Sequence, residues 1–143
     1  MFDKLLCAVD GSHSSQKAAA LAAALAERLG AKLTFLTVQT MDAEHAAKDV
    51  YWDSQLLGAA ELQTERELEE ARNAAASAGL EELACVKTYG RSVAEAIVAY
   101  AEKEGFQHIV TGSSGRSGVG RMLLGSVAAD VVAKAHCPVT VAR

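Results

Sequence analysis

Hydrophobic and polar positions along the chain follow two alternating patterns. Short runs rich in β-branched and aromatic residues, such as KLTFLTV, indicate buried strands. Longer segments in which apolar residues return every three or four positions indicate amphipathic helices. The strands are expected at residues 4–9, 32–38, 83–88, 107–111 and 139–142, and the helices at 13–29, 58–78, 92 to near 105, and 127–135.

Residues at the predicted helix ends support these boundaries. Ser12 or Ser14 can accept the first amides of the helix at 13–29, and Gly30 follows its last turn, where a left-handed residue is common. Ser92 and Glu95 have the spacing of a capping box. Apolar or small residues share one side of each helix: Leu21, Leu25 and Leu29 in the first, Leu57, Thr64, Leu68, Ala71 and Ala75 in the second, Val93, Ile97 and Tyr100 in the third.

The alternation of strand and helix predicts an α/β fold. Neighbouring parallel strands need crossover connections, and these are usually helices, so the sheet should be mostly parallel with helices on both faces. With 143 residues, half of them hydrophobic, the chain has the size of one domain, residues 1–143. The connection at 39–57 has no clear period, so it is a loose surface connection, a short helix or a lid over a ligand.

Composition narrows the functional classes. A formal net charge of −4 argues against a general nucleic-acid binder, which normally has a basic face. Cys7, Cys85 and Cys137 lie far apart beside apolar runs, as small reduced core residues do, and this points to the cytoplasm. The sequence has no recognisable signal peptide and no run near the roughly 18 apolar residues of a membrane span, so no membrane partner is expected.

The predicted functional site is the glycine- and serine-rich run 111–127, TGSSGRSGVGRMLLGSV, between a strand and a helix. Such a turn places backbone amides without intrahelical partners at the positive end of a helix, and glycines allow an anion to approach the backbone closely. These are the features of a phosphate-binding turn. The Walker A pattern fails because Arg121 and Met122 follow Gly120. The dinucleotide fingerprint fails because Leu123 stands at the place of its third glycine.

The spacing Gly112-x-x-Gly115-(nine residues)-Gly125-Ser126, followed by Val127 and a final CPVTVAR, resembles the nucleotide-binding members of the universal stress protein family. The resemblance covers the whole chain. It implies a doubly wound five-stranded parallel sheet of order 3-2-1-4-5, of the adenine nucleotide alpha hydrolase-like type, that binds ATP. With that order, the turns after the first and fourth strands face each other across one crevice.

The resemblance also implies roles for individual residues. Ala8, Val9 and Asp10 line the adenosine, and Val38 offers main-chain hydrogen bonds to adenine. Asp10 is also the candidate ligand of Mg²⁺ or Mn²⁺, together with phosphate oxygens. Its alternative role is to stabilise the turn after the first strand. The remaining nucleotide contacts are Gly112, Gly115, Gly125, Ser126 and Val127.

Two kinds of alternative stay open at the glycine run. The motif could be only a turn, and Ser126 could be only a helix cap. Arg116 and Arg121 suit a triphosphate as guanidinium groups but could equally face solvent. Ser114 is a departure, since many relatives carry a basic or histidine side chain there.

Catalytic machinery is not evident. The four histidines are scattered without metal-ligand spacing. The sequence has no GxSxG nucleophile motif and no cysteine that its pattern pairs with a histidine. A protein that grips ATP without a water-activating residue is expected to hold it more than hydrolyse it, although slow hydrolysis or self-phosphorylation stays open. The rival function is a nucleotide-independent interaction protein.

The last strand suggests how the chain assembles. If Val139, Thr140 and Val141 form the edge of the sheet, they present unpaired backbone groups that invite another strand. The resemblance implies a homodimer built by antiparallel pairing of this strand with its twin. The alternative is a covered edge in a monomer.

Overall fold

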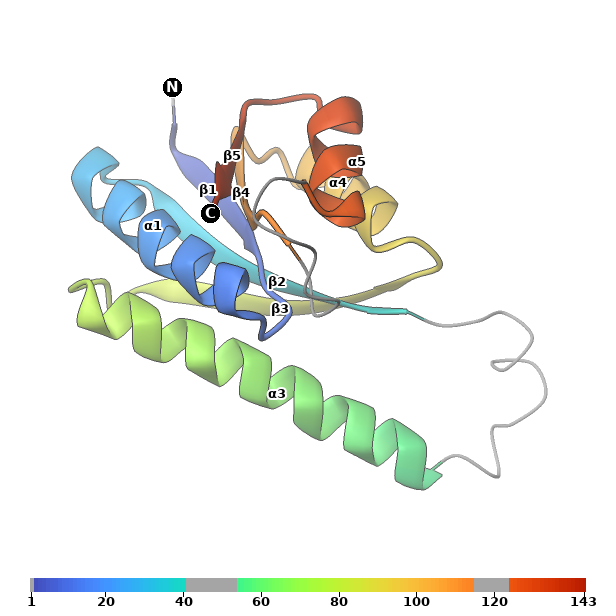
Figure 1. Ribbon diagram of the computed structural model, residues 1–143. Coiled ribbons are helices and arrows are strands. Elements are labelled where there is room, and N and C mark those ends of the chain that lie inside the picture. The colour runs from blue at the N-terminus through green and yellow to red at the C-terminus, as the bar shows by residue number, and fades with distance from the viewer. Residues whose placement is uncertain (1, 41–53, 115–123) are drawn as a thin grey trace.

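The computed structural model describes residues 2–40, 54–114 and 124–143 (Figure 1). Strands and helices alternate along it. The elements are β1 (Lys4–Ala8), α1 (His13–Leu29), β2 (Lys32–Thr40), α3 (Ser54–Ser77), β3 (Leu83–Gly90), α4 (Val93–Lys103), β4 (His108–Gly112), α5 (Ser126–Lys134) and β5 (Val139–Ala142).

The five strands form one parallel sheet in the order β3-β2-β1-β4-β5. The predicted α/β fold and strand order are therefore confirmed. β1 pairs with β2 on one side and with β4 on the other, so the direction of winding reverses between β1 and β4. Because all strands are parallel, the carboxyl ends of β1 and β4 meet at the same edge of the sheet.

Two apolar clusters, one on each face of the sheet, hold the helices in place. Figure 1 shows α1 and α3 on one face and α4 and α5 on the other. Along β1, Leu5 and Cys7 belong to the cluster under α1 and α3, while Leu6 and Ala8 belong to the cluster under α4 and α5. This follows from the alternation of side chains along a strand. Both faces of β1 are thus buried, as expected for the centre of a parallel sheet.

α1 packs on the sheet through alanines. The residues of α1 that are less than a few per cent exposed are Ala18, Ala19, Ala22, Ala23 and Ala26. Leu21 and Leu25 only flank this face, and Leu29 is 50% exposed. The leucine stripe noted in the sequence is therefore the margin of the buried face, because the small alanine side chains let the helix lie closer to the strands.

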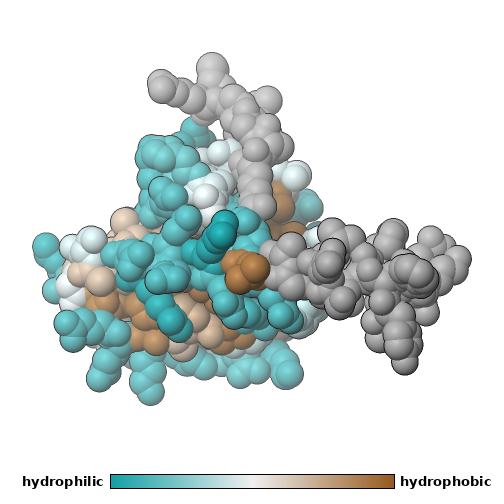
Figure 2. Space-filling view, turned by 90° about the horizontal axis from the view of Figure 1, so that it is seen from below, coloured by the Kyte–Doolittle hydropathy of each residue, from teal (hydrophilic) through white to brown (hydrophobic). Residues whose placement is uncertain are grey.

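The charged side of α3 faces solvent, as Figure 2 shows for the face on which this helix lies. Hydrophilic side chains cover most of that view, with smaller hydrophobic areas between them. The opposite side of α3 buries Thr64, Leu68, Ala71 and Ala75, as predicted. Buried Glu67 also lies there, and its carboxylate accepts a 2.9 Å hydrogen bond from Thr37 Oγ1 of β2.

The element ends differ from the predicted ones by a few residues. β2 and β3 each run two residues further, and the added pairs are Gln39↔Tyr89 and Thr40↔Gly90. α3 begins at Ser54, four residues earlier than predicted, so most of the predicted connection, residues 41–53, lies outside the described residues. Ser12, not Ser14, is the N-cap of α1, and Gly30 is left-handed with φ of 64°.

The cysteines follow the prediction in part. All three are free thiols, but only Cys7 is fully buried, and that burial raises the pKa of its thiol well above the ordinary value. Cys85 and Cys137 are partly exposed. Within the described residues, no helix is long and apolar enough to cross a membrane.

We expect Ala22→Leu to lower the free energy of unfolding by about 1–3 kcal/mol, because overpacking forces a close helix away from the sheet. Leu29→Ala is the matched control in the same helix and should change stability by less than about 0.5 kcal/mol. Urea denaturation of both variants measures this. Equal losses would contradict an alanine face as the packed surface of α1.

Candidate nucleotide-binding pocket

A pocket of about 300 Å³ opens at the carboxyl ends of β1 and β4, where the winding reverses. This volume is at the lower end of the roughly 300–1,000 Å³ typical of small-molecule sites. Four further elements contribute described residues to it: the second half of β2, the first turns of α1 and α4, and the start of α5. The sequence prediction that the turns after β1 and β4 face each other therefore holds.

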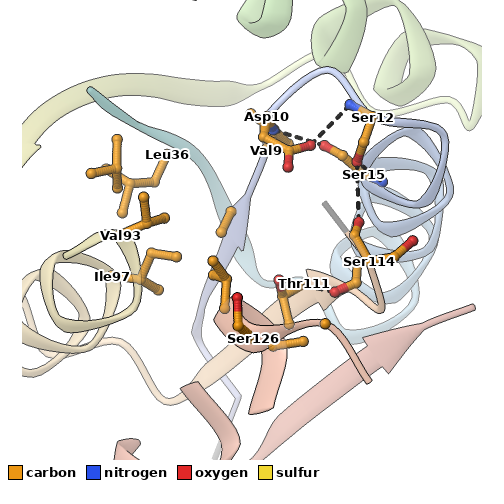
Figure 3. Close-up of a pocket in the computed structure, with 16 residues that line it drawn as sticks. Val9, Asp10, Ser12, Ser15, Leu36, Val93, Ile97, Thr111, Ser114 and Ser126 are labelled. Carbon is orange, nitrogen blue, oxygen red and sulfur yellow. Dashed lines mark hydrogen bonds between the residues drawn. The ribbon is translucent and has the colours of Figure 1, made fainter. Parts of the chain in front are cut away.

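The pocket has an apolar part and a polar part (Figure 3). Leu36, Val93 and Ile97 gather on one side in that view, and Val38 joins them in the lining. Asp10, Ser12, Ser15 and Ser114 lie on the other side. The lining is completed by Ala8, Val9, Thr111, Gly112, Gly125, Ser126, Val127 and Ala128.

Asp10 stabilises the turn after β1. Its Oδ1 accepts a 2.9 Å hydrogen bond from the amide of Ser12, and its own amide donates to Ser15 Oγ over 3.0 Å. The first bond is an Asx-turn, the alternative role left open by the sequence. These two bonds hold the carboxylate of Asp10 at the wall of the pocket, so its turn role does not remove it from the site.

No group of three or more His, Cys, Asp or Glu side chains suited to a metal ion occurs in the part of the chain that the structure describes. Asp10 is the acidic residue among those lining the pocket. Beside a single carboxylate such as that of Asp10, Mg²⁺ takes its other oxygen ligands from water and from the phosphates of a bound molecule.

The start of α5 presents backbone amides to the pocket. Gly125 is the N-cap, and its amide donates to the carbonyl oxygen of Ser113 over 2.7 Å. The first intrahelical bond runs from the amide of Ala129 to the carbonyl of Gly125, 2.9 Å. The amides of Ser126, Val127 and Ala128 precede that bond, so they have no acceptor within the helix and suit an anion.

One alternative left open by the sequence, that Ser126 is only a helix cap, is wrong. Ser126 is the first residue of α5, and the N-cap position belongs to Gly125, which has no side chain. The amide of Gly125 is engaged with the carbonyl of Ser113, and Gly125 itself lies in the pocket lining.

Gly112 is required by packing inside the protein. A Cβ atom there would lie 2.5 Å from Ser14 Oγ, 2.8 Å from the carbonyl carbon of Ser14 and 2.9 Å from the amide of Ser15. The end of β4 therefore lies directly against the first turn of α1. The sequence analysis treated this glycine only as a ligand contact, because a close approach between distant segments leaves no local pattern.

Gly115 and Arg116, the other predicted contacts in the glycine run, lie outside the described residues, as does Arg121. Val38 lies at the pocket but is not the end of β2, which extends to Thr40. Five lining residues were not predicted from the sequence: Ser12, Ser15, Leu36, Val93 and Ile97. Val93 and Ile97 were predicted as a buried stripe, and only the topology places that stripe over the pocket.

We expect Gly112→Ala to destabilise the protein by about 1–3 kcal/mol whether or not a ligand is present, since two of the three clashing atoms belong to the backbone. Gly30→Ala is the control: its surroundings are open, and only its left-handed φ of 64° opposes a side chain, at about 1 kcal/mol. Thermal and urea unfolding compare them. A Gly112→Ala protein as stable as wild type would contradict this role.

The whole chain, residues 1–143, matches the family model described as the universal stress protein family. Universal stress protein YxiE of Bacillus subtilis is 33% identical over 150 residues, covering all of both chains. Universal stress protein UspA from Lactobacillus plantarum superposes with a TM-score of 0.83 at 26% identity over 99% of this chain and 98% of that one.

A further solved relative is a universal stress protein in complex with cAMP. Its TM-score is 0.75 at 28% identity, and the match covers 98% of this chain and 96% of that chain. Since the family model and a full-length relative above 30% identity agree, the chain belongs to the universal stress protein family.

Proposed function

We propose that this protein binds ATP, with Mg²⁺ or Mn²⁺, in the pocket between β1 and β4. The observation that carries the proposal is the division of one pocket into an aliphatic part and a polar part that ends at a helix N-terminus. A flat apolar base with an anionic tail needs such a site. The relative solved with cAMP, an adenine nucleotide, supports the same ligand class.

Backbone geometry supports adenine at the aliphatic end. The amide of Val9 donates to the carbonyl oxygen of Leu36 over 2.9 Å, so the backbone groups of Leu36 are directed toward β1. Backbone groups of successive residues in a strand point to opposite sides, so the N–H and C=O of Val38, two residues on, are also directed toward β1. Ala8, opposite Leu36, is the last β1 residue paired with β2. The N–H and C=O of Val38 thus suit the ring nitrogen and amino group of adenine.

The phosphates would lie at the other end. The amides of Ser126, Val127 and Ala128, with the hydroxyl of Ser126, form the described part of the proposed phosphate site. Gly115 and Arg116 belong to the proposal from the sequence alone. Asp10 would share a divalent cation with the phosphate oxygens, and Ala8, Val9, Gly112 and Gly125 would shape the wall.

The proposed role is that of a nucleotide-dependent stress or signalling module in the cytoplasm. We expect it to act as a single domain whose partners are neither nucleic acids nor membranes. We expect it to retain ATP with little turnover. Among the described lining residues, Asp10 is the side chain that could serve as a general base, and it is already held in its turn.

Ser126→Glu tests the phosphate end. A negative charge at the first residue of α5 favours the helix but repels phosphate, so the fold should persist while the ATP dissociation constant rises at least about tenfold. Ser126→Gln is the matched neutral control. Calorimetric titration with Mg-ATP and with adenosine measures both, and phosphate release measures turnover.

Adenosine should bind all three proteins alike, because it carries no phosphate. Equal ATP affinity in the Glu and Gln variants would contradict the placement of the phosphates at this end of the pocket. No binding of either ligand to the wild-type protein would overturn the nucleotide proposal and favour an interaction protein. Rapid phosphate release would favour the enzyme alternative.

The proposal includes a homodimer through β5. The strand pairs only with β4 within the described sheet, and Val139, Thr140 and Val141 are each partly exposed. The carbonyls of Pro138 and Ala142 accept bonds from the β4 side, from the amides of Ile109 and Ser113. By alternation, the backbone groups of Val139 and Val141 are directed away from β4, toward a partner strand.

Val141→Pro should therefore convert the dimer to a monomer without unfolding it, because proline removes an outward N–H and is tolerated on an edge strand. Thr140→Pro, which removes an N–H directed toward β4, should instead destabilise the fold. Sedimentation equilibrium and circular dichroism distinguish the two. A Val141→Pro protein that stays dimeric would place the interface elsewhere.

A further inference from the structure

The hydroxyl of Ser14 joins two segments that are 100 residues apart in sequence. Ser14 Oγ donates to the carbonyl oxygen of Ser114, and the amide of Ser114 donates back to Ser14 Oγ over 3.3 Å. The two bonds connect the first turn of α1 to Ser114, which lies two residues after the end of β4. We call this pair of bonds the serine bridge. Ser14 is 7% exposed, so water competes little for this bridge.

Ser14 does not line the pocket, whereas Ser114 does. Its two hydrogen bonds to Ser114 connect Ser14 to the pocket lining, and its hydroxyl also lies 3.5 Å from that of Ser12. Ser12 Oγ lies 3.4 Å from the same carbonyl oxygen, near the limit for a hydrogen bond, so Ser14 is the stronger partner.

The surroundings leave the bridge little freedom. Gly112 is so close to Ser14 that no side chain fits between β4 and α1. On the other side, the amide of Ser113 donates to the carbonyl of Ala142 over 2.8 Å, and its carbonyl accepts from Gly125 over 2.7 Å. Ser113 is thus fixed to β5 and α5, and Ser114 is fixed to α1 by the serine bridge.

We infer that Ser14 is a positioning residue that sets the preference of the pocket for phosphorylated ligands over the free nucleoside. It does so by holding Ser114 beside the polar end of the pocket. The inference rests on the proposed function, since it assigns the base to the aliphatic end and the phosphates to the polar end. Sequence analysis considered Ser14 only as a helix cap, a role that Ser12 has instead.

Ser14→Ala provides the test. Removal of the hydroxyl abolishes both hydrogen bonds of the bridge and should raise the dissociation constant of Mg-ATP by about five- to tenfold. The constant for adenosine should change by less than about twofold, because adenosine does not reach the polar end. The measured quantity is the ratio of the two constants, determined by calorimetry, which a general loss of packing would not change.

Ser77→Ala is the matched control. Its hydroxyl also bonds a backbone carbonyl, that of Asn73 at 3.0 Å, but on the exposed end of α3. Its ATP-to-adenosine ratio should equal that of the wild type. If Ser14→Ala does not fold, Ser14→Cys keeps the shape of the side chain with a weaker donor, and the ratio of the ATP to the adenosine dissociation constant should again rise.

An unchanged ratio in a folded Ser14 variant would overturn the inference while leaving nucleotide binding intact. Equal weakening of both ligands would do the same, by showing a general structural effect. Absence of binding of either ligand to the wild-type protein would overturn the proposed function, and the inference with it.

Discussion

The contact between the end of β4 and the first turn of α1 is the constraint on which the site depends. At Gly112 the two segments approach so closely that even a methyl group would meet the backbone of Ser14 and Ser15. The same closeness continues along α1, where alanines face the sheet. Small residues therefore bring α1 close to β1 and β4, and the pocket forms beside this contact.

That approach explains why serines dominate the polar part of the pocket. A short hydroxyl side chain can bond a neighbouring turn across a narrow gap, while a longer one would not fit. Ser15 holds the turn at Asp10, and Ser14 holds Ser114. Each hydroxyl supplies a hydrogen-bond partner to backbone groups in a partly buried place.

The structure also separates glycines that look alike in the sequence. Gly112 is required by contact with α1, Gly125 forms the N-cap of α5, and Gly30 supplies a left-handed end to α1. Glycines that belong to one spacing motif therefore have different roles: some are required by packing inside the protein, and others line the pocket. The amides of Ser126 and Val127, beyond the last glycine, suit an anion better than the amide of Gly125, which already bonds Ser113.

The sequence by itself determined the elements, their types, and the α/β class, because periodicity and end residues such as Gly30 and Ser92 act locally. With the family resemblance, it also predicted the strand order and the residues near the pocket. Only the tertiary structure decided that Val93 and Ile97 form the aliphatic wall, that Ser14 bonds Ser114, and that Gly112 faces α1. These are contacts between segments up to 100 residues apart, and no local pattern records them, because they arise only when the sheet brings β1 and β4 together.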